Sequence, residues 1–123
     1  MEDTLTIELP IKFPSLNAYI SQMNRNRYAG NAYKQKYQRL ITPHLSKLPK
    51  PFPYPVKIHF LWIEDNHRRD LDNIAFAKKF ILDALKNNGN LTDDNYHFVK
   101  GFSDDFSYEK EARVILTFTK GEL

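Results

Sequence analysis

The chain has 123 residues, of which 41% are hydrophobic and 27% are charged. These values are close to globular averages, so we expect a single folded domain over residues 1–123. There is no cysteine, which excludes disulfides, thiolate zinc sites and cysteine nucleophiles. The formal net charge is +3, a surplus that permits nucleic-acid binding but does not by itself indicate it.

The chain shows no sign of membrane insertion or secretion. No apolar stretch approaches the ~18 residues of a membrane span. The opening residues Met1 to Thr4 are acidic and lack the basic and apolar regions of a signal peptide. We therefore expect a cytoplasmic protein without a membrane partner, which also suits the absence of cysteine.

The first half of the chain predicts a strand, a loop and a helix. Alternating Leu5, Ile7 and Leu9 predict a strand that Pro10 ends. The segment Pro14-Ser15-Leu16-Asn17 indicates a helix start or a tight turn, and the polar residues 21–31 indicate a mobile loop. Apolar residues at spacings of three and four predict a helix over 31–47, which Pro43 should kink or shorten.

The second half predicts a strand, a long helix and two more strands. A stiff proline-rich connector covers 49–55, and alternation predicts a strand over 56–63. A helix is predicted over 70–87, ended by Asn88-Gly89. Strands near 96–102 and 113–119 should form a hairpin, with Asp104-Asp105 and Glu109-Lys110-Glu111 at its solvated tip. The order β-α-β-α-β-β predicts an α+β domain with a mixed sheet and two main helices.

Two carboxylates stand at the start of the long predicted helix. Asp70 and Asp72 flank Leu71, and acids this close repel one another unless positive charge lies beside them. Mg²⁺ is the natural candidate because it prefers carboxylate oxygen and water. An Asp at a helix start is also a common cap, so the pair alone does not establish a metal site. The preceding Arg68 and Arg69 could hold a phosphate against the metal.

A second acidic pair, Asp93-Asp94, follows the same helix. The helix should span about 24 Å, and the seven residues from Asn87 can extend roughly 24 Å. A return of the second pair to the first is therefore possible but nearly taut.

A continuous helix would place Lys79 on the face of Asp72, two turns further on. A lysine there could neutralise phosphate charge, and the adjacent Lys78 is the alternative. Phe76 would share that face, so we expect it to pack under a loop or against a partner subunit.

These features in order resemble the RusA family of Holliday-junction resolvases. The resemblance rests on Arg68-Arg69-Asp70-Leu71-Asp72-Asn73, then Asp83-Ala84-Leu85, Gly89 and Asp93-Asp94. The opening Leu9-Pro10 followed by Pro14-Ser15-Leu16-Asn17 is similar as well. The resemblance covers most of the chain and is strongest from Arg68 to Val99.

The resemblance implies a homodimeric endodeoxyribonuclease that resolves four-way DNA junctions by paired nicks, in recombination and repair. It implies Mg²⁺ as the cofactor, with Mn²⁺ able to substitute, and Asp70, Asp72 and Asp94 as the catalytic metal ligands. We expect one subunit to supply all three carboxylates. Small resolvases of this family often come from phage, so a prophage origin fits.

The chain departs from the family at the functional lysine. That lysine stands one helical turn after the second Asp, where this chain has Phe76. The helix is three residues longer between Asn73 and Asp83 than in the best-known member. Counting back from Asp83 instead puts Lys79 in the place of the lysine.

Residues 23–50 contain seven Lys or Arg residues and no Asp or Glu. Basic residues interleaved with Tyr28, Tyr33 and Tyr37 predict a phosphate-tracking surface with stacking partners. The alternative is a solvated basic helix whose tyrosines lie in the core. Asn17 either supports the site or caps a helix. The candidate DNA-binding residues are Arg68, Arg69, Asn17, Arg25, Arg27, Lys34, Lys36 and Arg39.

Other functions fit the sequence less well. The four histidines form no spaced cluster, so a zinc site is not expected, although His67 could touch a phosphate. A calcium-binding loop starting at Asp70 would need a glycine where Ala75 stands and a glutamate where Ile81 stands. The main alternative is an accessory protein of the same fold that binds branched DNA without cutting it.

Overall fold

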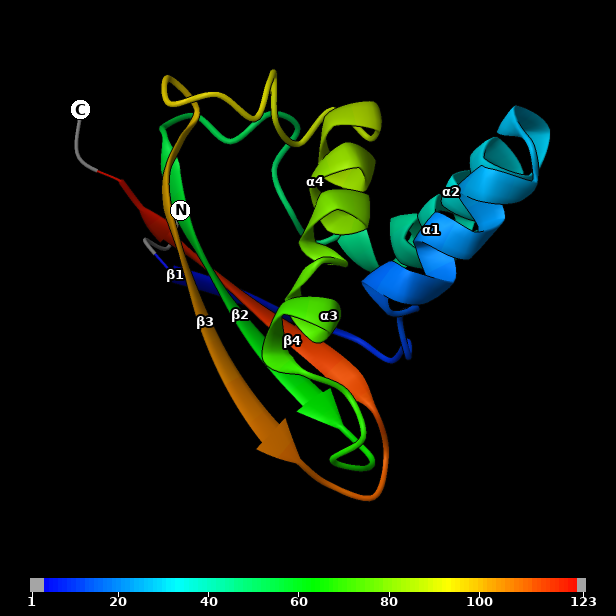
Figure 1. The fold of residues 1–123 in the computed structure, drawn as a ribbon. Helices are drawn as coiled ribbons and strands as arrows, with labels where there is room; N and C mark the ends of the chain where they lie inside the picture. The colour runs from blue at the N-terminus through cyan, green and yellow to red at the C-terminus, as the bar shows by residue number, and fades with distance from the viewer. Residues whose placement is uncertain (1–3, 122–123) are drawn as a thin grey trace.

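The structure is a computed structural model that describes residues 4–121. The predicted α+β class and the β-α-β-α-β-β order are confirmed, with two α-helices in each helical region (Figure 1). No helix in residues 4–121 is long and apolar enough to cross a membrane. The elements are β1 (Thr4–Leu9), α1 (Leu16–Arg25), α2 (Arg27–Ile41), the 3₁₀ helix η1 (Thr42–Leu45), β2 (Val56–Glu64), α3 (Leu71–Ala75), α4 (Lys78–Asn87), β3 (Val99–Tyr108) and β4 (Arg113–Lys120).

The four strands form one mixed sheet in the order β1-β4-β2-β3. Strand β4 is antiparallel to both β1 and β2, and Thr4 pairs with Thr119. Strands β2 and β3 are parallel, so they need a long crossover, which α3 and α4 provide. The predicted β3–β4 hairpin is wrong, because β2 lies between these strands. Asp104 and Asp105 belong to β3 and pair with residues of β2 rather than forming a tip.

The helices cover one face of this sheet, and the core lies between the two layers (Figure 1). Alternate residues of β2 from Val56 to Trp62 are buried, because successive side chains of a strand point to opposite faces. The Trp62 indole donates a 2.8 Å hydrogen bond to Asp104 on β3. Glu64 continues the same alternation and is buried as well.

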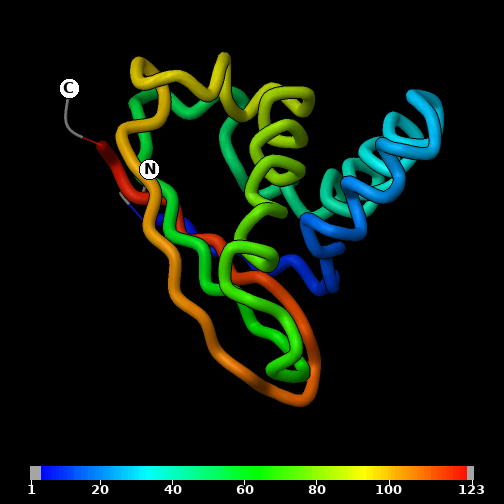
Figure 2. Tube along the Cα trace, in the orientation of Figure 1, coloured from blue at the N-terminus to red at the C-terminus, as the bar shows by residue number. Residues whose placement is uncertain are grey.

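Helices α1 and α2 form a hairpin that projects from the sheet (Figures 1 and 2). The mobile loop predicted over 21–31 is wrong, because both helices are capped. Ser15 Oγ accepts from Ala18 N at 3.1 Å, and Asn26 Oδ1 accepts from Ala29 N at 2.8 Å. These caps satisfy backbone N–H groups that a helix start leaves open. The expected shortening by Pro43 is confirmed, since α2 ends at Ile41.

An aromatic cluster fixes the base of the hairpin against α3 and α4. Tyr19 of α1 lies 5.2 Å from Phe76 and 5.5 Å from Phe80, between ring centroids. Tyr37 of α2 lies 5.5 Å from Phe80. Each such pair adds about 0.5–1.5 kcal/mol beyond its burial. Phe76 therefore packs against helix α1, rather than under a loop or against a partner subunit as the sequence predicted.

The single helix predicted over 70–87 is interrupted at residues 76 and 77. Around the break the backbone bonds are of the i→i−3 kind, such as Ala77 N to Ile74 O at 3.3 Å and Phe80 N to Ala77 O at 3.0 Å. Such bonds tighten and redirect a helix. The predicted end at Asn88-Gly89 is confirmed, because Gly89 has φ 87°, which favours glycine.

Candidate metal centre and nucleic-acid interface

The loop after β2 presents two carboxylates at the start of α3. Asp70 is the N-cap residue, with extended backbone, but its side chain makes no capping hydrogen bond. Asp72 lies in the first turn, where its carboxylate accepts a hydrogen bond from the backbone N–H of Asn73, at 3.0 Å. Both residues are exposed. Their carboxylate oxygens are therefore available to an external ligand.

Asp70 and Asp72 also lack a basic partner. In residues 4–121, nine acidic side chains lie within 4.0 Å of a Lys, Arg or His nitrogen. The three without such a contact in this range are Asp70, Asp72 and Glu111. Two of these three, Asp70 and Asp72, are separated only by Leu71 and follow Arg68-Arg69. Adjacent unpaired carboxylates repel, and a bound cation would relieve that repulsion.

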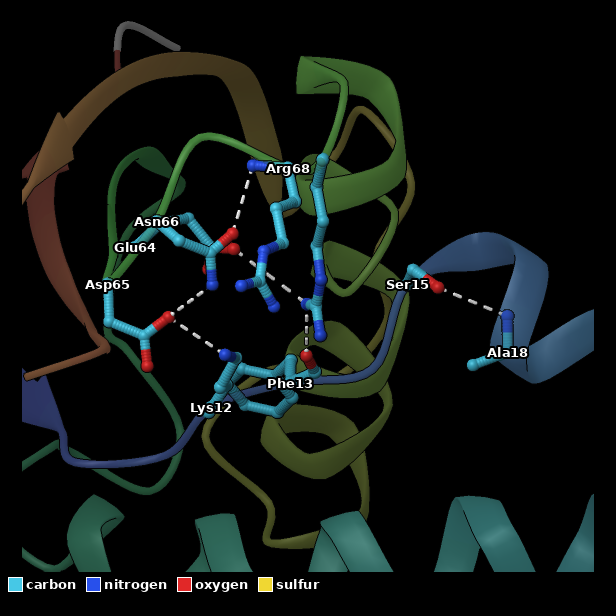
Figure 3. A network of polar contacts seen from close by, with 9 residues as sticks. Lys12, Phe13, Ser15, Ala18, Glu64, Asp65, Asn66 and Arg68 are labelled. Atoms are coloured by element: carbon cyan, nitrogen blue, oxygen red, sulfur yellow. Dashed lines mark hydrogen bonds and ion pairs between the residues drawn. The ribbon is translucent and has the colours of Figure 1, made fainter.

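The two arginines before this pair differ in their surroundings. Arg68 is exposed, and only its backbone N–H is engaged, with Asn66 Oδ1 at 2.9 Å. The Arg69 guanidinium turns inward, donating to the backbone oxygen of Phe13 at 2.7 Å and lying 3.8 Å from Glu64 Oε1. Figure 3 shows the surrounding polar network. Arg69 therefore ties the segment before α1 to the end of β2, and Arg68 is the better placed for a phosphate.

Glu64 is a site residue that the sequence analysis missed. It is 6% exposed, and its Oε1 atom has no hydrogen-bond partner among residues 4–121. Burial raises the pKa of the Glu64 carboxyl, and the charges of Arg69 and Lys12 oppose that shift. The signal was available, because Glu64 continues the buried alternation of β2. This alternation predicts that the Glu64 side chain points to the face of the sheet that the helices cover.

Glu64→Gln should change how stability depends on pH. The folded protein holds the Glu64 proton more tightly than the unfolded chain, whose reference pKa is 4.5. The free energy of unfolding of the parent therefore falls as pH rises from that value through the raised pKa. The variant has no such titration, so its Tm relative to the parent should increase as pH rises above about 4.5, through the range in which the folded protein loses the Glu64 proton. A difference that stays constant or decreases would contradict the raised pKa.

The structure does not bring Asp94 together with Asp70 and Asp72 in one chain. Asp94 precedes β3, whose Val99 pairs with Val56 at the start of β2, whereas Asp70 follows the end of β2. The nine-residue strand between them is about 26 Å long. Asp94 lies instead 3.8 Å from Lys86 in the last turn of α4. Across residues 4–121, no three acidic or histidine side chains are grouped to hold a metal ion.

The segment that carries Asp94 is anchored at that far end of α4. Asn90 is fully buried and donates to the backbone oxygen of Pro49 at 2.9 Å. Asp93 accepts from the backbone N–H of Asp94 at 2.8 Å, which lowers the pKa of Asp93. The chain therefore does not fold back along the helix to bring Asp93 and Asp94 to Asp70 and Asp72.

The two candidate lysines have different surroundings. Lys78 donates to Asp104 at 2.8 Å and lies over the Phe102 ring at 4.9 Å, so it is committed to the sheet. Lys79 is 57% exposed and, among residues 4–121, its ammonium contacts Asp83 at 3.9 Å, so it is accessible to a ligand. Lys79 would share a face with Asp72 only in one continuous helix, and the break at residues 76 and 77 interrupts that helix.

The structure divides the predicted phosphate-tracking surface. Arg25, Arg27, Lys36 and Arg39 are exposed along the hairpin, whereas Lys34 is half-buried over the Tyr19 ring. Asn17 is exposed near the start of α1, and Ser15 rather than Asn17 caps that helix.

The three tyrosines among these basic residues also separate. Tyr37 is 8% exposed, and Tyr33 packs against the core. Burial is the main cause that raises the pKa of Tyr33 to about 12. Tyr28 is 79% exposed. Tyr33 and Tyr37 therefore lie in or against the core, as the alternative interpretation of the basic helix expected. Of these three tyrosines, only Tyr28 is accessible as a stacking partner.

The histidines are dispersed, as expected. The His67 ring stacks on Tyr108 with centroids 3.7 Å apart, and His59 contacts Ser103 and Asp105 on the edge strand β3. His67 is nevertheless exposed.

Comparison with models of protein families gives no match for this chain, and none of the curated proteins matches it.

Proposed function

We propose that this chain is a Mg²⁺-dependent endodeoxyribonuclease that cuts four-way and related branched DNA, acting as a homodimer in the cytoplasm. The observation that carries the proposal is the pair Asp70 and Asp72, two exposed carboxylates without a basic partner in residues 4–121. The exposed Arg68 beside them and the basic hairpin supply the charge that a polyanion requires.

The chemistry of this pair fits the ion. Mg²⁺ is typically held by one or two carboxylates together with waters and substrate phosphate oxygens, so Asp70 and Asp72 suffice on the protein side. When bound, the ion would supply a water of lowered pKa and polarise the scissile phosphate.

The chain's own residues would then position the DNA. Arg68 can hold a non-bridging phosphate oxygen next to the carboxylates, since guanidinium matches phosphate geometry. Lys79, with its exposed ammonium, is the lysine available to offset charge that builds up at the phosphate. Arg69 and Glu64 do not face the DNA in this proposal. They fix the loop that carries Arg68 and Asp70.

Asp94 enters this proposal only through the dimer. It lies at the opposite end of β2 from Asp70, so a role as a metal ligand requires that it come from the second protomer. Two symmetric protomers would then place two such sites on one junction, which accounts for paired nicks.

The direct test is cleavage of a labelled four-way junction by the parent protein. We expect nicks in two opposing strands with Mg²⁺ or Mn²⁺, none with EDTA, and much slower cutting of linear duplex of the same sequence. Binding without cutting under all metal conditions would instead support the accessory-protein alternative. Equal cutting of linear and branched DNA would overturn the proposed substrate.

A further inference from the structure

Tyr28 stands at the turn of the α1–α2 hairpin, in a setting unlike that of the other tyrosines. It is the second residue of α2, after the Asn26 that joins the helices. It is 79% exposed, and the structure gives it no ring or hydrogen-bond partner among residues 4–121. Tyr96 is nearly as exposed, but its ring lies 4.1 Å from the Lys100 ammonium. The ring of Tyr28 contributes nothing to the core and is open to an external partner, and the charges around it carry the argument further.

The charges around Tyr28 indicate what that partner is. Arg25 and Arg27 flank the turn and are both exposed. The sequence contains no Asp or Glu from residue 10 to residue 63, so no acid of the hairpin neutralises them. Arg25 donates to the uncharged Gln22 at 3.4 Å, so the charge of neither arginine meets an acid within residues 4–121. An exposed ring close in sequence to two such guanidinium groups offers a stacking surface together with phosphate contacts, the combination by which proteins hold unpaired nucleotides. An apolar protein partner would leave both arginines desolvated without a counter-charge.

The position of the turn adds a spatial constraint. The start of α1 is fixed beside α3, where Tyr19 meets Phe76, and the turn lies at the outer end of the hairpin (Figure 1). Ten residues of α1 separate the two ends by about 15 Å. This equals roughly four base steps of a DNA strand, so the tip reaches a different nucleotide from the one beside Asp70.

We propose that Tyr28 stacks on a base exposed at the branch point of DNA, while Arg25 and Arg27 hold the flanking phosphates. The inference rests on the proposed branched-DNA substrate. Inside a duplex each base face is covered by its neighbours, whereas strand exchange at a branch interrupts the stack. Tyr28 thereby makes recognition depend on the branch rather than on sequence.

The test uses four-way junctions that carry 2-aminopurine at single positions around the branch, in EDTA so that no strand is cut. The parent should change the fluorescence at one or two branch positions and leave positions in the arms unchanged. Tyr28→Phe should keep the change, because stacking needs only the ring. Tyr28→Ala should lose it and bind the junction about tenfold more weakly, a loss on the scale of one stacked base.

Tyr96→Ala is the matched control, since it removes an equally exposed tyrosine elsewhere, and it should behave as the parent. Circular dichroism should show the same thermal transition for all variants. Tyr28→Ala with the affinity and fluorescence of Tyr96→Ala would overturn the inference.

The two proposals fail in distinguishable ways. A parent that shows Tyr28-dependent stacking in EDTA but never cuts with Mg²⁺ would support this inference and overturn the nuclease. A parent that cuts junctions and ignores Tyr28→Ala would overturn this inference alone. No binding to branched DNA would overturn both.

Discussion

Asp70→Asn is expected to reduce junction cleavage by at least about 10²-fold, the scale on which removal of one charge-stabilising group acts at a reaction centre. The amide keeps the shape of the side chain but lacks the negative charge that attracts Mg²⁺. Because Asp70 is exposed and makes no capping hydrogen bond, the fold should be unaffected. Junction affinity in EDTA should equal that of the parent or exceed it slightly, since one repulsive charge is gone. Cleavage with Mg²⁺ and binding without it are measured on the same junction.

Glu111→Gln is the matched control for this variant. Glu111 is the third acidic side chain of residues 4–121 without a basic partner, and it lies in the connection between β3 and β4. The Glu111→Gln variant loses the same charge as Asp70→Asn at a different place, so it should cut the junction like the parent. Full cleavage by Asp70→Asn, or equal losses in both variants, would remove Asp70 from the site.

Mixed dimers of Asp70→Asn and Asp94→Asn chains should recover activity that neither variant has alone. Within one chain, Asp94 precedes the strand that pairs with the start of β2, whereas Asp70 follows the end of β2. Because β2 is about 26 Å long, we expect a site that contains both residues to combine two protomers. In the mixed dimer, one of the two symmetric sites keeps both carboxylates. We expect about half the parental nicking rate and single rather than paired nicks.

Two differently tagged chains, expressed together and purified through both tags, provide the mixed dimer. Each homodimeric variant should cut at least about 10²-fold more slowly than the parent. A mixed dimer that stays inactive would place all three carboxylates in one protomer after a rearrangement of the chain. An Asp94→Asn homodimer with parental activity would show that Asp94 is not part of the site.

Local patterns in the sequence predicted most of the secondary-structure elements of the fold. Alternation in Leu5 to Leu9 and in Val56 to Trp62 marks two strands, because a half-buried strand repeats every two residues. Gly89 and Pro43 mark helix ends through backbone conformation alone. The pairing of strands is not local. A short polar connection between β3 and β4 favours a hairpin, yet β2 occupies the place between them, and only tertiary packing decides this.

The acidic pair of the candidate site could be predicted from the sequence, but the spatial arrangement of the residues around it could not. Asp70 and Asp72 are only two positions apart in sequence, so their proximity follows from the chain itself. The position of Asp94 depends on where β3 lies in the sheet, and β3 pairs with β2 rather than with β4 as a hairpin would require. The helix break lies at residues 76 and 77, where Phe76 packs against Tyr19 of a distant segment. Both errors arise because long-range contacts determine geometry that local propensity leaves open.

The pairing of Thr4 with Thr119 has a practical consequence for handling the protein. The two ends of the described chain lie on adjacent strands, on the side of the sheet away from the α1–α2 hairpin (Figure 1). A short peptide could join them without distorting either strand, so circularly permuted variants are accessible. A surface tether or fused reporter attached there would leave the hairpin tip and the loop of Asp70 unobstructed.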